Sequence, residues 1–291
     1  MERLKLWIGA ARPKTLWAAV SPVIIGIAMA FEAGQVHWLA AVVTLLTAVL
    51  IQIGTNFAND YYDFVKGADT AERHGPQRLT QAKLVKPQTM KKAFIAVFSI
   101  AFVCGLYLVY VGGWPILLIG LFSILFGVLY TGGPYPLGYN GLGDIFVFIF
   151  FGPVAVGGTY YIHTHHFDPV VLTAGIAPGL IASAILVVNN LRDIKTDTKA
   201  GKNTLAVRFG EGFTKAEYIL LLLFAAVTPL LTYRISGRGI YALLASLFLI
   251  PSVPAIKKIF TEKGAALNAV LGETGKLLLI YSLIFSAGWV L

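Results

Sequence analysis

The sequence predicts an all-α integral membrane protein with about nine transmembrane helices. Of its 291 residues, 57% are hydrophobic and only 13% are charged, whereas soluble domains have roughly 45–50% apolar and about 25% charged residues. The mean hydropathy of +0.76 agrees with this composition. Apolar runs of about 20 residues, the length that crosses a bilayer, recur along the whole chain. Because these runs are uniformly apolar, they do not fit the alternating strands of a β-barrel.

Nine apolar runs are expected to be spans of one membrane domain that covers residues 1–291. The third and fourth runs are divided only by GGWP, which predicts a tight turn between two helices. Before the first run, MERLKLWIGAARPKTLW carries four basic residues and no cleavage site, so it predicts an interfacial segment rather than a signal peptide. The spans are expected at 16–32, 38–59, 93–111, 114–131, 143–162, 170–190, 216–233, 239–256 and 274–291.

Basic residues gather on one side of this predicted topology. The formal net charge is +9, and the chain contains 23 Lys and Arg residues. All except Arg234 and Arg238 lie in the N-terminal segment, in loops that the nine spans place on the same side or, for Lys276, just past the last of these loops. This asymmetry predicts a cytoplasmic N-terminus and an external C-terminus, in a bacterial inner membrane or, alternatively, a plastid-type one. The charge therefore indicates topology and contact with membrane lipid, and no nucleic acid.

The cysteine and the histidines contribute little to the predicted chemistry. The single cysteine, Cys104, lies inside the third span, so no disulfide within the chain is possible. His163, His165 and His166 lie on the predicted outer side, where we expect solvated loop residues and not a metal cluster. Only His74 lies near the polar motifs, and no general base is identified.

Two helix ends on the predicted cytoplasmic side each carry a pair of aspartates. Asp60 and Asp63, spaced i and i+3, follow the second span, and Asp193 and Asp197, spaced i and i+4, follow the sixth. Both spacings place two side chains on one face of a helix. Helix capping or solvation would explain a lone aspartate. Two such pairs beside membrane spans favour a functional role.

The chemistry of facing carboxylate pairs predicts a cation between them, because the pairs would otherwise repel each other. Ligand sets made only of oxygen favour Mg²⁺, Mn²⁺ or Ca²⁺ over zinc, and Mg²⁺ keeps waters or phosphate oxygens in its coordination sphere. Carboxylates, a divalent metal and interleaved basic side chains together indicate a diphosphate site. The basic residues near the motifs are Lys66, Arg73, Arg78, Arg192, Lys195 and Lys202.

The two motifs resemble those of a known family. NDYYD followed by GAD, with RDIKTDTKAGKNTLAVRFG farther along the chain, is similar to the aspartate-rich motifs of the UbiA superfamily of intramembrane prenyltransferases. The resemblance implies a helical bundle around a central cavity, where Mg²⁺ and the diphosphate of a polyprenyl donor bind between the motifs. It implies catalytic and metal-binding roles for Asp60, Asp63, Asp193 and Asp197, diphosphate contacts from Asn59, Arg192 and Lys202, and support from Asn56 and Asp69.

Further blocks narrow the resemblance to one branch of the superfamily. RPKTL, GADTAERHGPQRLTQ, YTGGPYPLGYNGLGD and NNLRDIKTDTKAGKNTLAVRFG resemble enzymes that prenylate 1,4-dihydroxy-2-naphthoate in menaquinone synthesis. Asp144 departs from the glutamate expected in much of this branch but keeps the acidic character. The branch implies transfer from polyprenyl diphosphate to 1,4-dihydroxy-2-naphthoate with loss of carbon dioxide and diphosphate. The remaining expected substrate contacts are Arg12, Lys14, Lys66, Arg73, Arg78, Tyr139 and Asn190.

Two of these segments also have a simpler explanation. Prolines and glycines in YTGGPYPLGYNGLGD predict irregular backbone, which is tolerated where it lines a cavity. Tyr135 and Tyr139 would then present a ring or hydroxyl to a developing cation. A plain interfacial turn is the alternative. Arg12 and Lys14 are similarly expected either to hold the naphthoate carboxylate or to anchor the chain at the interface.

Other functions remain as alternatives. A cation transporter would place its carboxylates at mid-membrane, whereas these pairs lie at helix ends beside arginines. A transferase of CDP-alcohols would need one compact aspartate motif, and this chain has two motifs far apart. Among prenyltransferases, 4-hydroxybenzoate, chlorophyll-synthase-like and glyceryl-phosphate acceptors stay open, as do the prenyl chain length and the oligomeric state.

Overall fold

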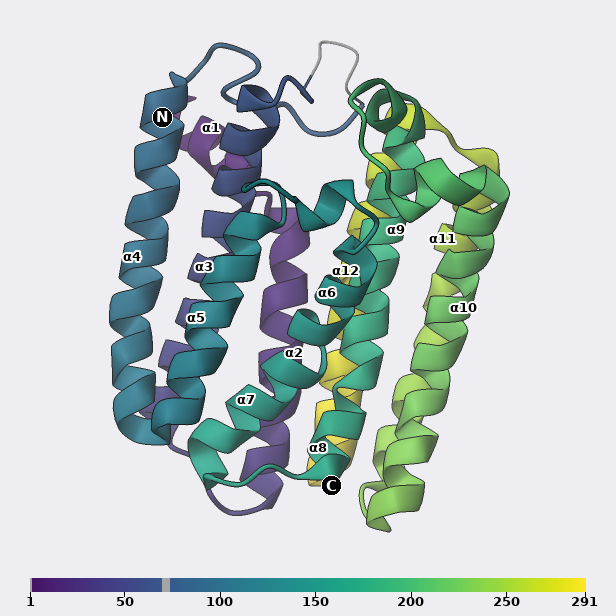
Figure 1. Cartoon of the computed structure of the whole chain (residues 1–291). Coiled ribbons are helices and arrows are strands. Elements are labelled where there is room, and N and C mark those ends of the chain that lie inside the picture. Colours follow the sequence, from purple (N-terminus) through teal and green to yellow (C-terminus); the bar gives the residue numbers. More distant parts are fainter. Residues whose placement is uncertain (1, 70–73) are drawn as a thin grey trace.

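The computed structural model describes residues 2–69 and 74–291, with side chains from residue 4 onward. In this part of the chain every regular element is helical, which confirms the all-α prediction (Figure 1). The helices are α1 (Glu2–Ala10), α2 (Pro13–Glu32), α3 (Trp38–Val65), α4 (Pro87–Gly112), α5 (Trp114–Leu129), η1 (Leu137–Tyr139), α6 (Gly143–Phe151), α7 (Pro153–Thr164), α8 (Pro169–Ala174), α9 (Ile176–Lys199), α10 (Leu205–Ser236), η2 (Ile240–Phe248), α11 (Leu249–Thr261), η3 (Gly264–Ala266) and α12 (Leu267–Val290).

The number of membrane-crossing stretches agrees with the prediction of about nine. Among the described residues, 8 helical stretches are long and apolar enough to cross a membrane, and α5, with 16 residues, is a shorter apolar helix. Several stretches are composite, joining α6 to α7, α8 to α9, η2 to α11 and η3 to α12. The helices extend past the predicted apolar runs, α3 to Val65 and α9 to Lys199, which agrees with the helical spacing predicted for the aspartate pairs. The aspartate motifs are therefore the last helical turns of two spans.

Two composite stretches contact each other at glycines where the helices break. Gly152 separates α6 from α7, and Gly175 separates α8 from α9. A Cβ built on Gly152 would lie 2.6 Å from the carbonyl oxygen of Gly175 and 2.9 Å from the Cα of Gly179. Since a side chain does not fit there, glycine permits the close approach of the two backbones. The contact fixes α6 and α7 against α9, which carries the second aspartate pair.

The two aspartate motifs end on the same face of the bundle. In Figure 1, α1 and the ends of α3 and α9 lie at the top, whereas the C-terminus of α12 lies at the bottom. The largest hydrophobic core includes residues of α9, α10 and α12. Its fully buried aromatic side chains include Tyr218, Tyr281 and Phe285. This core holds α9 in place while the loops above it build the site.

Candidate active site

A polar cavity of about 180 Å³ lies where the two aspartate motifs meet. Asp63 reaches it from the end of α3, and Asp193 and Asp197 reach it from the end of α9. Two motifs that are remote in sequence thus contribute to one cavity. Among the predicted site residues, its wall contains Arg12, Asn56, Asn59, Asp63, Arg78, Tyr139, Asn190, Asp193, Asp197 and Lys202.

Three polar residues of α3 reach the cavity from one side of the helix. Asn56, Asn59 and Asp63 follow one another at intervals of three and four positions, so their side chains share one face. All three belong to the cavity wall, and Asn59 accepts a hydrogen bond from the hydroxyl of Thr131 at 2.8 Å. Asp60 has the spacing of the same face, but its carboxylate binds backbone amides of the loop after α3 and is not part of the cavity wall. The first aspartate pair is therefore divided between two environments.

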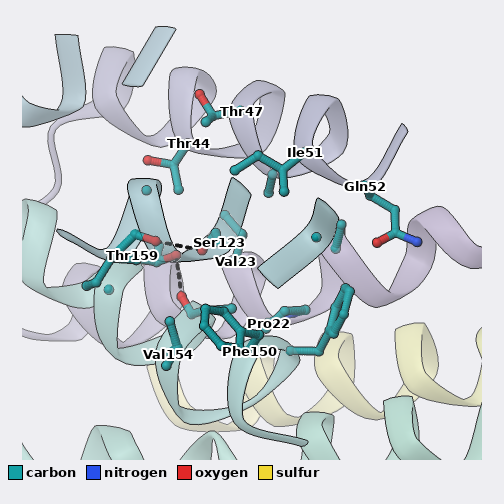
Figure 2. Close-up of a pocket in the computed structure, with 18 of the residues that line it drawn as sticks. Pro22, Val23, Thr44, Thr47, Ile51, Gln52, Ser123, Phe150, Val154 and Thr159 are labelled. Atoms are coloured by element: carbon teal, nitrogen blue, oxygen red, sulfur yellow. Dashed lines mark hydrogen bonds between the residues drawn. The ribbon is translucent and has the colours of Figure 1, made fainter. Parts of the chain in front are cut away.

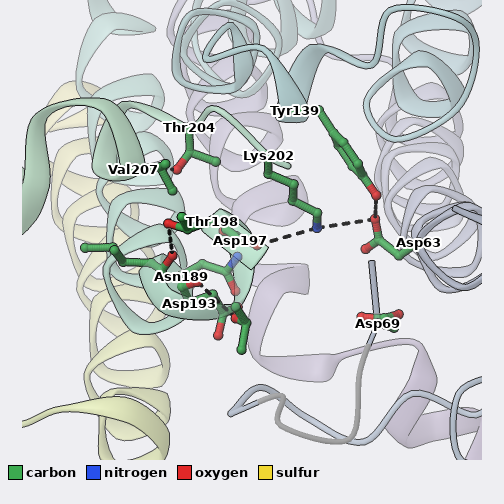
Figure 3. Close-up of polar contacts among 12 residues, drawn as sticks. Asp63, Asp69, Tyr139, Asn189, Asp193, Asp197, Thr198, Lys202, Thr204 and Val207 are labelled. Atoms are coloured by element: carbon green, nitrogen blue, oxygen red, sulfur yellow. Dashed lines mark hydrogen bonds and ion pairs between the residues drawn. The ribbon is translucent and has the colours of Figure 1, made fainter. Parts of the chain in front are cut away.

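Lys202 bridges the two motifs across the cavity (Figure 3). Its Nζ lies 3.4 Å from Oδ1 of Asp63 and 3.7 Å from Oδ1 of Asp197. The loop after α9 places it there, because the amide of Lys202 donates to the carbonyl oxygen of Asp197 at 2.9 Å. The next amide, that of Asn203, donates to the carbonyl oxygen of Tyr139 at 2.7 Å. This cation offsets the repulsion between carboxylates of opposite helices.

Tyr139 completes the bridge from the irregular segment after α5. Its hydroxyl donates to Oδ1 of Asp63 at 2.7 Å, and its ring centroid lies 4.6 Å from Nζ of Lys202 (Figure 3). Burial raises the pKa of the Tyr139 phenol well above its ordinary value, and the negative charge of Asp63 raises it further. Tyr139 is therefore a neutral hydrogen-bond donor that orients Asp63.

Arg78 approaches the same carboxylate from the loop between α3 and α4. Its Nη2 donates to Oδ2 of Asp63 at 2.8 Å, and its Nε lies 3.4 Å from Oδ2 of Asp69. Burial opposes the charged form, but the nearby carboxylates, with Asp69 first, outweigh it and raise the pKa of the guanidinium. Within the described residues, Nη1 of Arg78 is buried and has no hydrogen-bond partner. A buried charged donor without a partner in the cavity wall suits an anionic ligand.

Arg192 is engaged with its own neighbours on the second motif. Its Nε and Nη2 bind both carboxylate oxygens of Asp193, the first at 2.9 Å. Nη1 also donates to Oδ1 of Asn268 and Nη2 to Oδ1 of Asn189, each at 2.7 Å. The guanidinium does not belong to the cavity wall. Arg192 therefore orients Asp193 and ties α9 to α12, and the direct diphosphate contact stays a prediction.

Two further predicted polar contacts, Lys14 and Lys66, are not part of the cavity wall. Lys66 donates to the carbonyl oxygen of Gly133 at 3.1 Å, and partial burial lowers the pKa of its amine. The Lys14 side chain packs along α12, because a Cβ built on Gly272 would lie 3.2 Å from its Cδ. Arg73 lies outside the described residues. The roles given to these residues by the sequence stay predictions.

Arg12 occupies a turn that directs the RPKTL segment toward the cavity. It separates α1 from α2 with a left-handed backbone at φ 52°. Asn56 holds this turn by donating to the carbonyl oxygen of Ala11 at 3.0 Å and to the hydroxyl of Thr15 at 3.2 Å. A left-handed conformation is uncommon for a residue other than glycine. The fixed turn thus places a basic side chain in the cavity wall.

A second, apolar cavity of about 200 Å³ (Figure 2) lies beside the polar one and shares part of its wall. Both walls contain Gln52, Thr55, Tyr130, Val147 and Phe151, so these residues mark the junction. Farther in, the wall is formed by side chains of α2 to α7 and is mostly hydrophobic. The arrangement suits a molecule with an anionic head and a long apolar tail.

Sequence reasoning missed the residues at this junction. Gln52, Thr55 and Tyr130 lie within apolar stretches that were expected to serve only as spans. Their signal was a polar side chain inside a membrane segment, which favours a position facing a cavity or the bundle interior. The expectation for His163 was wrong, because α7 continues to Thr164 and leaves this side chain only 2% exposed. Its Nδ1 accepts from the backbone amide of His37 at 3.4 Å.

The sequence pattern of the UbiA prenyltransferase family matches residues 19–289. The chain belongs to the UbiA prenyltransferase family. Its relatives within that family include the 1,4-dihydroxy-2-naphthoate octaprenyltransferase of Haemophilus influenzae, which is 38% identical over 99% of this chain and 96% of the relative. The enzyme of the same name from Escherichia coli is 37% identical over the same shares of both chains, 99% and 96%.

A solved UbiA structure has the same fold. The UbiA homolog from Archaeoglobus fulgidus bound to DMAPP and Mg²⁺ aligns with a TM-score of 0.68 at 16% identity, covering 97% of this chain and 98% of that one. The match confirms the predicted UbiA-type bundle. Membership of the family and the apolar helices identify an integral membrane protein.

The cavity of this UbiA protein suits a divalent cation that is shared with a diphosphate. Within the part of the chain that the structure describes, no three His, Cys, Asp or Glu side chains form a ready-made metal site. Asp63, Asp193 and Asp197 instead offer oxygens from opposite walls of one cavity. Mg²⁺ binds through one or two carboxylates and fills its sphere with water and phosphate oxygens. The donor set therefore fits Mg²⁺ held together with a substrate.

Proposed function

We propose that the protein transfers a polyprenyl group from polyprenyl diphosphate to 1,4-dihydroxy-2-naphthoate, as a step in menaquinone synthesis. The observation that carries this function is the polar cavity with both aspartate motifs, beside an apolar cavity that shares part of its wall. Prenyl diphosphates have the same division into an anionic head and an apolar tail. The choice of acceptor rests on the full-length relatives named 1,4-dihydroxy-2-naphthoate octaprenyltransferase.

The diphosphate occupies the polar cavity in this proposal. The residues that would hold Mg²⁺ with it are Asp63, Asp193 and Asp197, and the metal would supply Lewis-acid stabilisation of the leaving diphosphate. Nη1 of Arg78, which makes no hydrogen bond among the described residues, binds a phosphate oxygen in this proposal. Lys202 balances the carboxylates and contacts the same anion. Asp60 was predicted as a further metal ligand, but it lies outside this wall.

The prenyl tail lies in the apolar cavity, beyond the junction formed by Gln52, Thr55 and Tyr130. The bond between the prenyl carbon and the diphosphate oxygen breaks at this junction, and positive charge develops on the allylic carbon. The apolar wall excludes water, which would otherwise capture this carbon. The Tyr130 ring at the junction faces both cavities and favours nearby positive charge.

The acceptor ring attacks the allylic carbon through the carbon that carries its carboxylate. The new carbon–carbon bond forms as carbon dioxide leaves with the loss of the carboxylate charge, so no ring proton has to be removed. This balance agrees with a cavity wall that contains no histidine among the described residues. Arg12 is the basic residue of the RPKTL segment in the wall and holds the acceptor carboxylate until it departs. The product is the reduced form of demethylmenaquinone.

The membrane orientation in this proposal follows the charge of the loops. The ends of α3 and α9 lie on the face of the bundle that carries the N-terminal segment (Figure 1). That segment and the loops on this face hold most of the basic residues, which favours a cytoplasmic site and an external C-terminus. Residues 1–291 act as one membrane domain in a bacterial inner membrane.

Prenyl transfer in isolated membranes tests the proposal, with 1,4-dihydroxy-2-naphthoate and 4-hydroxybenzoate as competing acceptors. We expect Mg²⁺-dependent demethylmenaquinone formation, which EDTA abolishes and added Mg²⁺ restores. Asp63→Asn and Asp193→Asn should each lose at least about 100-fold in rate, since a charged ligand is removed. Lys195→Met, at an exposed position of α9, is the matched control and should keep the wild-type rate. Transfer to 4-hydroxybenzoate alone would overturn the acceptor, and no transfer to either ring would overturn the function.

A further inference from the structure

Asp60 lies next to the proposed diphosphate site but makes its contacts outside it. Asp60 is only 2% exposed and is not part of the polar cavity wall. Its Oδ2 accepts from the backbone amide of Leu79 at 3.0 Å, and its Oδ1 accepts from the amide of Thr80 at 3.2 Å. Both carboxylate oxygens are therefore committed to the loop that connects α3 with α4.

The loop that Asp60 holds is a compact turn. The carbonyl oxygen of Arg78 accepts from the amide of Ala82 at 3.0 Å, and that of Leu79 accepts from the amide of Leu84 at 3.0 Å. The Leu79 side chain is 3% exposed and packs into a hydrophobic cluster with residues of α1, α3 and α4. The turn is thus fixed at two points, by an apolar side chain and by a buried carboxylate.

Arg78 immediately precedes the two amides that Asp60 binds. Its guanidinium lies between Asp63 and Asp69, at 2.8 Å and 3.4 Å respectively. Its Nη1 is buried and, among the residues the structure describes, makes no hydrogen bond. Since Arg78 belongs to the cavity wall, this nitrogen is a preorganised donor for an anion in the cavity. The backbone position of Arg78 decides where that donor points.

We propose that Asp60 is a positioning residue that acts through the Leu79–Thr80 amides to hold the Arg78 guanidinium toward the diphosphate, and that it does not bind the metal. The inference rests on the proposed function for the identity of the anion. It divides the first aspartate motif by role, because Asp63 serves the cavity and Asp60 fixes the turn that carries Arg78. The two carboxylates share one side of the helix, and the loop amides bind one of them while the cavity takes the other.

Hydrogen–deuterium exchange of the protein in nanodiscs gives a readout that does not depend on activity. Asp60→Asn should speed exchange at the Leu79 and Thr80 amides by at least about tenfold, since one of them loses its acceptor and the other keeps only an uncharged one. Asp63→Asn is the matched control on the same helix and should leave these two amides protected. Unchanged protection in a folded Asp60→Asn variant would overturn the anchoring contact.

Kinetics in the same nanodiscs separate positioning from metal binding. Asp60→Asn should raise the KM for polyprenyl diphosphate about tenfold and leave the Mg²⁺ concentration for half-maximal rate within about twofold of wild type. Asp63→Asn should raise that Mg²⁺ concentration instead. In the Asp60→Asn/Arg78→Gln double variant the two effects should not add, because one acts through the other. An increased Mg²⁺ requirement in Asp60→Asn, or additive effects, would overturn the proposal.

A second variant keeps the test decisive if Asp60→Asn does not fold. Asp60→Ser retains one acceptor for a loop amide but no carboxylate, so positioning predicts partial activity at the wild-type Mg²⁺ requirement. A metal ligand at this position predicts a raised requirement in the same variant. If the wild-type protein transferred no prenyl group, the proposed function would fail, whereas the exchange measurement would still report on the anchor.

Discussion

Replacing Tyr139 with phenylalanine removes one hydroxyl from the centre of the site and leaves the aromatic ring. The hydroxyl donates to Asp63 at 2.7 Å, and the ring lies 4.6 Å from Nζ of Lys202. These two contacts have different physical origins, a charge-assisted hydrogen bond and an interaction of a cation with a ring. Tyr139→Phe removes only the first, whereas Tyr139→Leu removes both. The pair of variants therefore measures which contact matters for prenyl transfer.

The expected magnitudes follow from the two contacts of Tyr139. A hydrogen bond to a charged group contributes about 1.5–3 kcal/mol, and about 1.4 kcal/mol corresponds to a tenfold change in rate. Tyr139→Phe should therefore lower kcat/KM by about 10- to 150-fold, since Asp63 loses the donor that orients it. The contact between the ring and the ammonium adds about 0.5–2 kcal/mol, so Tyr139→Leu should lose a further factor of about 2 to 30.

The assay is prenyl transfer in proteoliposomes at saturating Mg²⁺, with kcat/KM measured for polyprenyl diphosphate. Tyr135→Phe is the matched control, because Tyr135 lies in the same segment but is 60% exposed. It should keep the wild-type value. The reasoning is refuted if Tyr139→Phe stays within about twofold of wild type, or if the control falls as far.

Other substitutions test the apolar cavity, the contact of Lys202 with both aspartate motifs, and the glycine contact between α6 and α9. Gly120→Phe should restrict transfer to shorter prenyl donors, measured by chromatography of the products, because a Cβ there meets nothing within 4 Å in the apolar cavity. Gly212→Phe, at an equally open helical position outside that cavity, should not change the chain length. Lys202→Met should raise the KM for the diphosphate about tenfold or more, since it removes a charge-assisted contact, whereas Lys195→Met should not. Gly179→Ala should lower the unfolding free energy by about 1–3 kcal/mol, seen as a lower Tm in detergent, because its Cβ would lie 2.5 Å from a carbonyl oxygen.

The fold class was predictable from the sequence because membrane insertion leaves a local signal. Each span needs about 20 apolar residues, and this length is visible without knowing any partner helix. The polar ends of the spans were less predictable. Val65 and Lys199 lie in helical turns that continue past the apolar runs. In these polar turns, hydropathy no longer indicates where the helix ends. A polar site shared by the two motifs was also predictable. Four aspartates beside membrane spans repel one another unless cations lie near them.

The positions of single side chains around that site were not predictable in the same way. Asp60 and Asp63 have the spacing of one helical face, yet the loop after α3 binds one and the cavity takes the other. The junction residue Tyr130 and the buried His163 likewise depend on which helices pack beside them. Spacing determines which side of the helix a side chain lies on. The neighbouring elements determine which groups it contacts there.

By itself, the sequence determined that this protein crosses a membrane, that its basic loops share one side, and that two aspartate motifs carry its polar chemistry. Composition, helical period and charge distribution are local properties, so they need no coordinates. Only the tertiary structure decided that Lys202 joins Asp63 to Asp197 and that Tyr139 orients the first of them. These contacts join elements far apart in the chain, and packing of whole helices, rather than any short segment, brings them together.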